Sequence, residues 1–232
     1  MNKNVYIGYD TREDIAYQVS KFSILNKSEN ITINPLKLSE LKDKKLYWRD
    51  EDKLGSTEFT FSRFLVPELN EFNGWALFCD CDILFLEDIN NLFELADEKY
   101  AVMCVQHDYK PKEGVKMDGK AQTLYPRKNW SSLVLWNCSH PSNKAITKEL
   151  INQPDTTGKY LHRFSWLEDN EIGKISHEWN WLVDWYDEEK DGNPNAIHYT
   201  EGGPWFKNYR FCTYHHEWKN FLFEMMNNKL NF

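Results

Sequence analysis

The residues best suited to chemistry are two aspartates, Asp80 and Asp82, within an otherwise apolar stretch from Trp75 to Leu86. A short apolar run is typical of a buried strand. Carboxylates are costly in such a strand unless a positive charge meets them. At strand spacing both side chains point to the same side. The pair is therefore a candidate site for Mg²⁺ or Mn²⁺, since hard cations take oxygen ligands.

A histidine more than a hundred residues downstream, His198, is a candidate third ligand. Neutral imidazole binds Mn²⁺ well. His198 is followed by a loop with Gly202, Gly203 and Pro204. Glycines let backbone N–H groups approach phosphate closely, so we expect Gly202 and Gly203 to contact a diphosphate. Taken alone, a purely structural histidine is the alternative.

Two further charged residues are candidates for contacts with the same ligand. Arg63 is the only cation between Phe59 and Leu69, and its planar guanidinium suits phosphate; an ion pair with Glu68 is the alternative. Asp10 follows the first predicted strand, where ligands of open α/β sheets bind. It is expected either to accept from a base or a ribose hydroxyl, or to cap the helix that follows.

Acids also lie beside tryptophans, as in Trp166-Leu167-Glu168-Asp169. Carboxylates accept hydroxyl hydrogens and indole faces cover sugar C–H surfaces, so Glu168 and Asp169 are candidates for sugar binding. The alternative is a solvated helix face.

The remaining pattern predicts the elements that position these groups. Strands are expected over residues 5–9, 31–38, 75–86, 100–106, 131–137 and 196–199. Helices are expected over residues 14–25, 61–72, 89–96, 143–152, 161–173 and 218–226, with loops over 42–57 and 111–119. Strands alternating with helices indicate an α/β fold, and 232 residues suit a single domain.

Composition restricts the partners and the compartment. The net charge of −8 argues against a nucleic-acid binder. Five cysteines without disulfide or zinc spacing indicate a reducing compartment. The N-terminus resembles no signal peptide, and no apolar stretch has the length of a membrane span. We therefore expect a cytoplasmic protein whose membrane contact is at most peripheral.

In this order the segments resemble glycosyltransferases of the GT-A (nucleotide-diphosphosugar) fold, especially family 8, the glycogenin-like and lipooligosaccharide-galactosyltransferase-like enzymes. The resemblance runs from Val5 to about Trp205. Asp80 and Asp82 match the D-x-D that holds Mn²⁺ and the donor diphosphate, and His198 matches the metal-binding histidine. The positions that the resemblance and the patterns assign to the donor are Ile7, Gly8, Tyr9, Asp10, Arg12, Arg63, Asp80, Cys81, Ser131, Ser132, Gly202 and Gly203.

The sequence also departs from this family. Glu201 stands where a glycine is expected, no lysine precedes Pro204, and Ser131-Ser132 replaces an Asn-Ala-Gly-like segment. The chain is thus a divergent relative. Glu178-Trp179-Asn180 resembles a Trp-Asn segment of the family.

The resemblance implies a three-layer α/β/α sandwich with a mixed, mainly parallel sheet. Residues 1–105 would bind the nucleotide, and residues 106–232 the sugar and the acceptor. The implied reaction is retaining transfer of a hexose from a UDP-sugar to a glycan, lipid-linked or protein acceptor, with Mn²⁺ or Mg²⁺ and with Glu168, Asp169 and Arg63 as catalytic residues. Loop residues 110–127 are expected to contribute to the acceptor site.

Two other functions share these features. A phosphatase or sugar-nucleotide hydrolase could use the Asp80/Asp82 pair, although haloacid-dehalogenase-like phosphatases carry a small hydroxyl residue where Leu84 stands. A non-catalytic carbohydrate-binding protein would use the tryptophans and be indifferent to metal.

Overall fold

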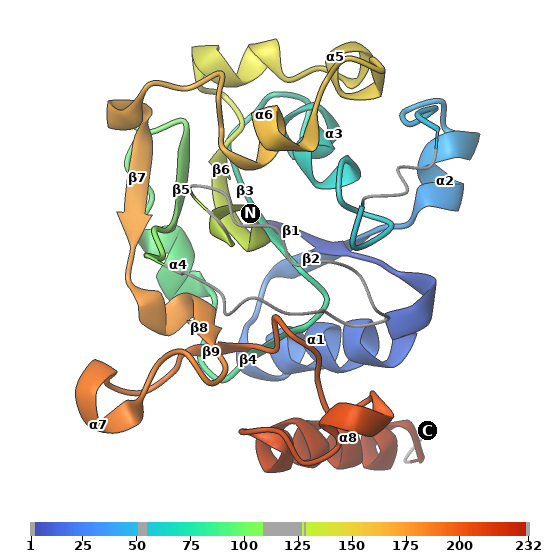
Figure 1. Ribbon diagram of the computed structural model, residues 1–232, viewed down its shortest axis with the longest axis vertical. Coiled ribbons are helices and arrows are strands. Elements are labelled where there is room, and N and C mark those ends of the chain that lie inside the picture. Colours follow the sequence, from blue (N-terminus) through green and yellow to red (C-terminus); the bar gives the residue numbers. More distant parts are fainter. Residues whose placement is uncertain (1–2, 51–54, 109–126, 128, 231–232) are drawn as a thin grey trace.

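A six-stranded sheet forms the centre of the computed structural model, which describes residues 3–50, 55–108, 127 and 129–230 (Figure 1). The strand order is β2-β1-β3-β6-β5-β7. These strands are β1 (Lys3–Gly8), β2 (Ile31–Leu36), β3 (Trp75–Cys79), β5 (Val102–Val105), β6 (Leu133–Asn137) and β7 (Ile172–Ile175). Among them β6 alone runs antiparallel to its neighbours. The predicted mixed, mainly parallel sheet is confirmed.

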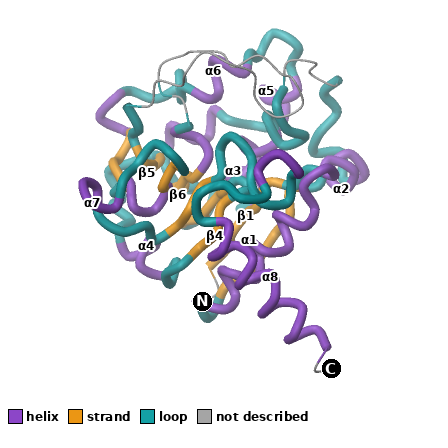
Figure 2. The backbone as a smooth tube through the Cα atoms, turned by 60° about the horizontal axis from the view of Figure 1, so that its bottom comes forward, coloured by secondary structure: helices purple, strands orange, loops and turns teal. Residues whose placement is uncertain are grey.

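Helices lie on both faces of this sheet, which gives the three layers (Figure 1). One side carries α3 (Val66–Leu69), α5 (Lys148–Asn152) and α6 (Gly158–His162). The other carries α1 (Asp14–Lys27), against which α8 (His215–Leu230) packs. Short helices α2 (Leu38–Asp43), α4 (Asn90–Glu94) and α7 (Glu188–Asp191) complete the described set. Figure 2 shows α8 extending away from the main body toward the C-terminus.

A second, smaller sheet has the order β4-β9-β8. It consists of β4 (Ile83–Phe85), β8 (Trp181–Leu182) and β9 (Ala196–His198). The single strand predicted over residues 75–86 is therefore wrong. The chain leaves the large sheet after Cys79 and enters the small sheet at Ile83, so that Asp80 and Asp82 occupy the crossing between the two sheets.

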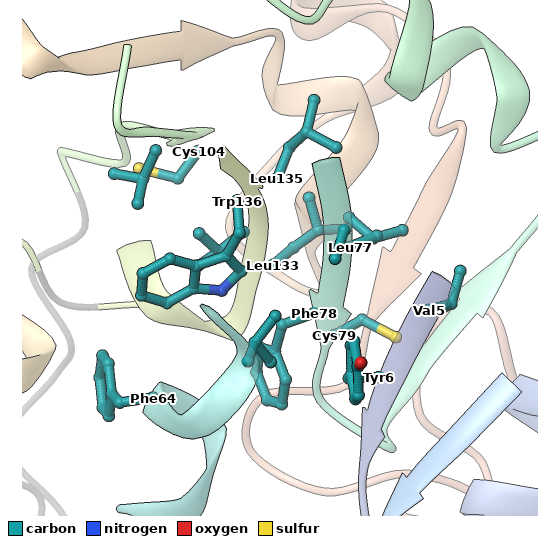
Figure 3. Packing of buried hydrophobic residues seen from close by; sticks show 14 of the residues in the cluster. Val5, Tyr6, Phe64, Leu77, Phe78, Cys79, Cys104, Leu133, Leu135 and Trp136 are labelled. Atoms are coloured by element: carbon teal, nitrogen blue, oxygen red, sulfur yellow. The ribbon is translucent and has the colours of Figure 1, made fainter. Parts of the chain in front are cut away.

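Aromatic packing fixes the helical segment that carries Arg63 over the large sheet. Phe64 meets the ring of Trp136 edge-on, with centroids 6.4 Å apart, and Trp136 stacks on Trp166 at 6.2 Å. Figure 3 shows Phe64 and Trp136 within this core. Burying each such ring stabilises the fold by about 1.5–3 kcal/mol. The helix predicted over residues 61–72 is a 3-10 turn, Ser62–Leu65, followed by α3, whose first turn contains Pro67.

Other expectations were wrong in detail, among them the helix predicted over residues 143–152, which is a 3-10 turn, Pro141–Ala145, followed by α5. Residues 161–173 do not form one helix: α6 ends at His162, a 3-10 turn covers Asp169–Glu171, and β7 begins at Ile172. Gly173 allows this strand to pack closely, because a Cβ there would lie 2.6 Å from the ring of Tyr100. The strand predicted over 31–38 ends at Leu36, and α2 occupies the start of the predicted loop. The loop predicted over residues 111–119 lies outside the described residues.

Among the described residues, no helix combines the length and the apolar character that crossing a membrane requires.

Candidate metal and donor site

Pairing between β4 and β9 brings His198 to the two aspartates. The strands are antiparallel with Ile83 opposite His198, and the backbone N–H of Tyr199 donates to the carbonyl of Asp82 at 3.1 Å. One ligand atom from each of Asp80, Asp82 and His198 then lies within 4.8 Å of the others. The structure therefore gathers the three predicted metal ligands at one point.

Arg63 orients the first of these aspartates. Its Nη1 lies 2.7 Å from Asp80 Oδ1 and donates to the carbonyl of Ser131 at 3.1 Å. The guanidinium also lies over the rings of Phe59 and Phe78, 4.9 and 5.1 Å from their centroids. Only 6% of the Arg63 side chain is exposed. In the structure Arg63 thus holds a candidate metal ligand, while its contact with the donor stays a prediction.

The alternative partner suggested for Arg63, Glu68, has a different neighbour. Glu68 Oε1 lies 3.3 Å from Lys148 Nζ, and its Oε2 accepts from the backbone N–H of Lys148. The ion pair between Arg63 and Glu68 is therefore not the arrangement that the fold adopts.

A hydrogen-bond chain holds the imidazole on the other side of the cluster. His198 Nδ1 lies 2.8 Å from Asn180 Oδ1, and Asn180 Nδ2 donates to Ser132 Oγ at 2.9 Å. Ser132 Oγ in turn donates to the carbonyl of Asn129 at 2.7 Å. His198 Nε2 faces Asp82 Oδ1 at 3.4 Å. In the sequence Asn180 belongs to the segment that resembles a Trp-Asn of the family, and its contact with His198 was not predicted.

The chemistry of the cluster fits a divalent cation. Two carboxylates and one imidazole nitrogen converge from separate segments, and a set of oxygen and nitrogen donors suits Mn²⁺, with Mg²⁺ favouring the oxygens. Carboxylates this close repel each other unless positive charge lies between them. Asp80, Asp82 and His198 would hold the ion, and Arg63 and Asn180 keep two of these ligands in position.

A buried carboxyl that the sequence did not predict, Glu13, lies near enough to this cluster to feel the charge of Asp82. Glu13 is 2% exposed and accepts a hydrogen bond from Trp205 Nε1 at 3.2 Å. Burial, with the nearby charges of Asp82 and Asp10, raises the pKa of Glu13 to about 8. The sequence signal was an acid that directly follows Tyr9-Asp10-Thr11-Arg12 at the end of the first predicted strand.

Asp10 adopts the helix-capping alternative. It is the N-cap of the 3-10 turn Thr11–Glu13, and its carboxylate accepts from the backbone N–H, Nε and Nη2 of Arg12 and from the backbone N–H of Glu58. Burial opposes ionisation, but these hydrogen bonds outweigh it and lower the pKa of Asp10. Four bonds occupy the lone pairs that a nucleobase or ribose was predicted to use.

The other predicted donor residues of the first strand are packed or partnered. Ile7 is fully buried, and a Cβ on Gly8 would lie 2.5 Å from the ring of Phe59. The hydroxyl of Tyr9 donates to Asp14 at 2.8 Å. Arg12 Nη2 donates to the carbonyl of Ser56 at 2.8 Å. The side chain of Ile7 therefore belongs to the core, which leaves the backbone for any donor contact here.

Further predicted donor residues surround the cluster. Ser131 Oγ lies 2.7 Å from His162 Nδ1. Cys81 is buried between the two aspartates, and burial, with the charge of Glu13, raises its thiol pKa well above the usual value, so the thiol is unreactive. Gly202 has φ +133°, and a Cβ on Gly203 would lie 2.0 Å from Trp205. Both glycines are needed for this loop to form.

Glu168 and Asp169 are not brought to the cluster. They precede β7, whereas Asp80 and Asp82 follow β3. Because β3 and β7 run in the same direction, the two acid pairs lie toward opposite ends of the sheet. The Asp169 side chain is 90% exposed and pairs with Arg127. A role for Glu168 or Asp169 at the reacting sugar stays a prediction.

A surface cavity of about 510 Å³ opens where β5 and β7 end, lined in part by Gln106, Lys174, His177 and Tyr186. The hydroxyl of Tyr186 lies 2.7 Å from Nδ1 of buried His107. Burial lowers the pKa of His107 to about 3, with smaller effects from His198 and His177. Aromatic rings beside polar groups suit a ligand rich in hydroxyls.

Comparison with known proteins agrees with this architecture. The family model described as glycosyl transferase family 8 matches residues 4–208. Protein CDI of Arabidopsis thaliana is 52% identical over 220 residues, which cover 93% of this chain and 84% of that protein.

Solved structures show the same fold at low identity. The glycosyltransferase GlyE of Streptococcus pneumoniae matches with a TM-score of 0.64 and 14% identity, over 100% of this chain and 64% of GlyE. The galactosyltransferase LgtC, in complex with donor and acceptor sugar analogs, matches with a TM-score of 0.55 and 9% identity over 94% of both chains. The chain therefore belongs to glycosyl transferase family 8 and is a glycosyltransferase of the GT-A fold.

Proposed function

We propose that this chain transfers a hexose from a UDP-sugar to an acceptor hydroxyl, with Mn²⁺ or Mg²⁺ held by Asp80, Asp82 and His198. The observation that carries the proposal is the convergence of these three side chains, within 4.8 Å of one another, in a family 8 chain. The acceptor is a glycan, a lipid-linked sugar or a protein. The cavity beside Tyr186 is the place we assign to it.

The divalent ion, when bound, stabilises the charge that develops on the leaving diphosphate. The protein's own groups prepare that site. Arg63 fixes one oxygen of Asp80 through a 2.7 Å contact, and the β4–β9 pairing fixes the distance of His198 from Asp82. The loop with Gly202 and Gly203 follows β9, and within it the Gly202 N–H donates to the carbonyl of Tyr199 at 2.8 Å.

We propose retention of configuration at the transferred sugar. An inverting transferase needs a base beside the acceptor hydroxyl. The two acids predicted for such a role, Glu168 and Asp169, lie before β7 and not after β3. Their position supports a reaction that does not depend on either of them as a base.

Thermal unfolding with UDP and Mn²⁺ tests the donor and the metal together. A ligand at 100 times its Kd adds about 2.7 kcal/mol to the stability of the folded state. For a chain of this size that raises Tm by roughly 5–10 °C. We expect this rise only when UDP and Mn²⁺ are both present, and we expect Asp82→Ala to abolish it together with transfer.

Asp97→Ala is the matched control, because Asp97 is exposed and pairs with Lys99 away from the cluster. It should keep the full Tm rise. Release of free sugar or phosphate without acceptor would instead support the hydrolase. Glycan binding indifferent to UDP and metal would support the carbohydrate-binding alternative. Full transfer by the wild type after removal of divalent ions would refute the proposal.

A further inference from the structure

In the series of hydrogen bonds that ends on His198, the chemistry of the groups fixes which one donates and which one accepts at each step. The series starts at the backbone carbonyl of Asn129, which can only accept, so the hydroxyl of Ser132 must donate to it across 2.7 Å. Ser132 Oγ has then used its one hydrogen. The group that faces it at 2.9 Å must be a donor, which is the Asn180 amide nitrogen.

The orientation of the Asn180 amide then determines which ring nitrogen of His198 carries the hydrogen. With Nδ2 turned to Ser132, Oδ1 faces His198 Nδ1 at 2.8 Å, and an amide oxygen can only accept. His198 must therefore carry its hydrogen on Nδ1. In the neutral ring this leaves the lone pair on Nε2, the atom that faces Asp82 Oδ1 at 3.4 Å.

We propose that Asn180 and Ser132 are positioning residues that lock His198 in the Nδ1–H tautomer and aim the Nε2 lone pair at the cation site. The proposal deepens the proposed function and rests on its metal site. It also adds a role for Ser132, a residue that was predicted to contact the donor. Ser132 is only 3% exposed, and its hydroxyl already donates one hydrogen bond and accepts another.

Because these residues are buried, the tautomer of His198 depends strongly on its contact with Asn180. Asn180 is fully buried and His198 is 2% exposed, so water cannot readily replace a lost partner. Second-layer partners of metal-binding histidines fix the tautomer and the ring orientation, and their loss typically weakens metal affinity about 10–100-fold. Removing the Asn180 amide would leave Nδ1–H buried without its acceptor, and the ring would be free to turn or to exchange its proton.

The tautomer can be read directly by ¹⁵N NMR of the histidine rings in the metal-free protein. The chain has seven histidines, and His198→Gln assigns the signals of His198. We expect the Nδ1–H form in the wild type and a mixture of tautomers in Asn180→Ala. Asn180→Asp keeps an acceptor oxygen and should keep the Nδ1–H form. An Nε2–H form in the wild type would overturn the proposal.

Calorimetric titration with Mn²⁺ alone measures the consequence for the cation. We expect Asn180→Ala to weaken binding about 10–100-fold, Asn180→Asp to recover most of that loss, and Ser132→Ala to cause a smaller loss. Asn143→Ala is the matched control, since Asn143 is also fully buried and donates two hydrogen bonds, to the carbonyls of Ala101 and Asn137. It should unfold more easily but bind Mn²⁺ as the wild type does.

The outcomes separate this proposal from the function on which it rests. Equal Mn²⁺ affinity of Asn180→Ala and wild type refutes the positioning role while leaving the metal site intact. Absence of Mn²⁺ binding by the wild type refutes the metal site itself. If Asn180→Ala does not fold, Asn180→Asp and Ser132→Ala still decide. Asn180→Asp removes the donor to Ser132 Oγ but keeps an acceptor facing His198 Nδ1, and Ser132→Ala removes both bonds of the Ser132 hydroxyl but leaves the Asn180 amide in place.

Discussion

We expect that removing one partner of the ion pair between Arg63 and Asp80 lowers the stability of the fold more than removing one partner of any other polar contact of the site. Their side chains are only 6% and 14% exposed, and the two charged atoms are 2.7 Å apart. Arg63→Ala would leave the Asp80 carboxylate beside Asp82 with no guanidinium to compensate it. It would also remove the cation from above the rings of Phe59 and Phe78.

The expected loss of stability follows from this geometry. Removing one partner of a buried pair costs about 3–5 kcal/mol. Because Asp80 keeps some contact with water, we expect Arg63→Ala to lie near the lower end of that range, about 3 kcal/mol. Asp80→Asn should cost less, since the amide oxygen still accepts from Arg63. In the double variant the unpaired carboxylate is gone, so the combined loss should fall short of the sum by about 1–3 kcal/mol.

Urea unfolding of the four proteins, followed by circular dichroism in metal-free buffer, measures this coupling. Lys148→Ala serves as control, because its pair with Glu68 is more exposed and should contribute less than about 1 kcal/mol. Strict additivity of the Arg63 and Asp80 changes would refute the argument. So would a loss of less than about 1 kcal/mol for Arg63→Ala.

Two more changes test the surroundings of the site. Burial raises the pKa of Glu13 to about 8, so folded protein binds the proton more tightly and stability falls as pH rises from about 4.5 to 8. Glu13→Gln should flatten this fall, as urea midpoints at the two pH limits would show. Gly8→Ala would place a Cβ 2.5 Å from Phe59 and should cost about 1–3 kcal/mol. Unchanged midpoints would contradict that prediction, and Phe59→Leu should recover part of the loss.

The large sheet could be predicted because its central strands are apolar. The segments around Val5, Leu77, Val102 and Leu135 are each continuous buried runs, which is the pattern of strands covered on both faces. Short or edge elements could not be predicted as well. The strand β7, at the edge of the sheet, follows Asp169–Glu171 within a pattern that also fits a helix, and only its pairing with β5 decides between the two.

Within the site, residue types were more predictable than residue partners. Asp80, Asp82 and His198 were identified by chemistry and do converge. The partner of Arg63 was left between a phosphate and Glu68, and the fold supplies Asp80. The burial of Glu13 and the hydrogen bond between Asn180 and His198 were not predicted. Both depend on tertiary burial and side-chain orientation, which the spacing of residues along the sequence does not reveal.

The sequence by itself determined an α/β chain with a carboxylate pair at the end of a buried strand, since apolar runs and charged interruptions are local properties. Only the tertiary structure decided that this strand breaks into two sheets at the pair, and that β4 then pairs with β9. That pairing joins Ile83–Phe85 to Ala196–His198, more than a hundred positions later, through backbone hydrogen bonds. It is a long-range contact between short segments, each of which could have paired elsewhere, and it alone brings the imidazole to the carboxylates.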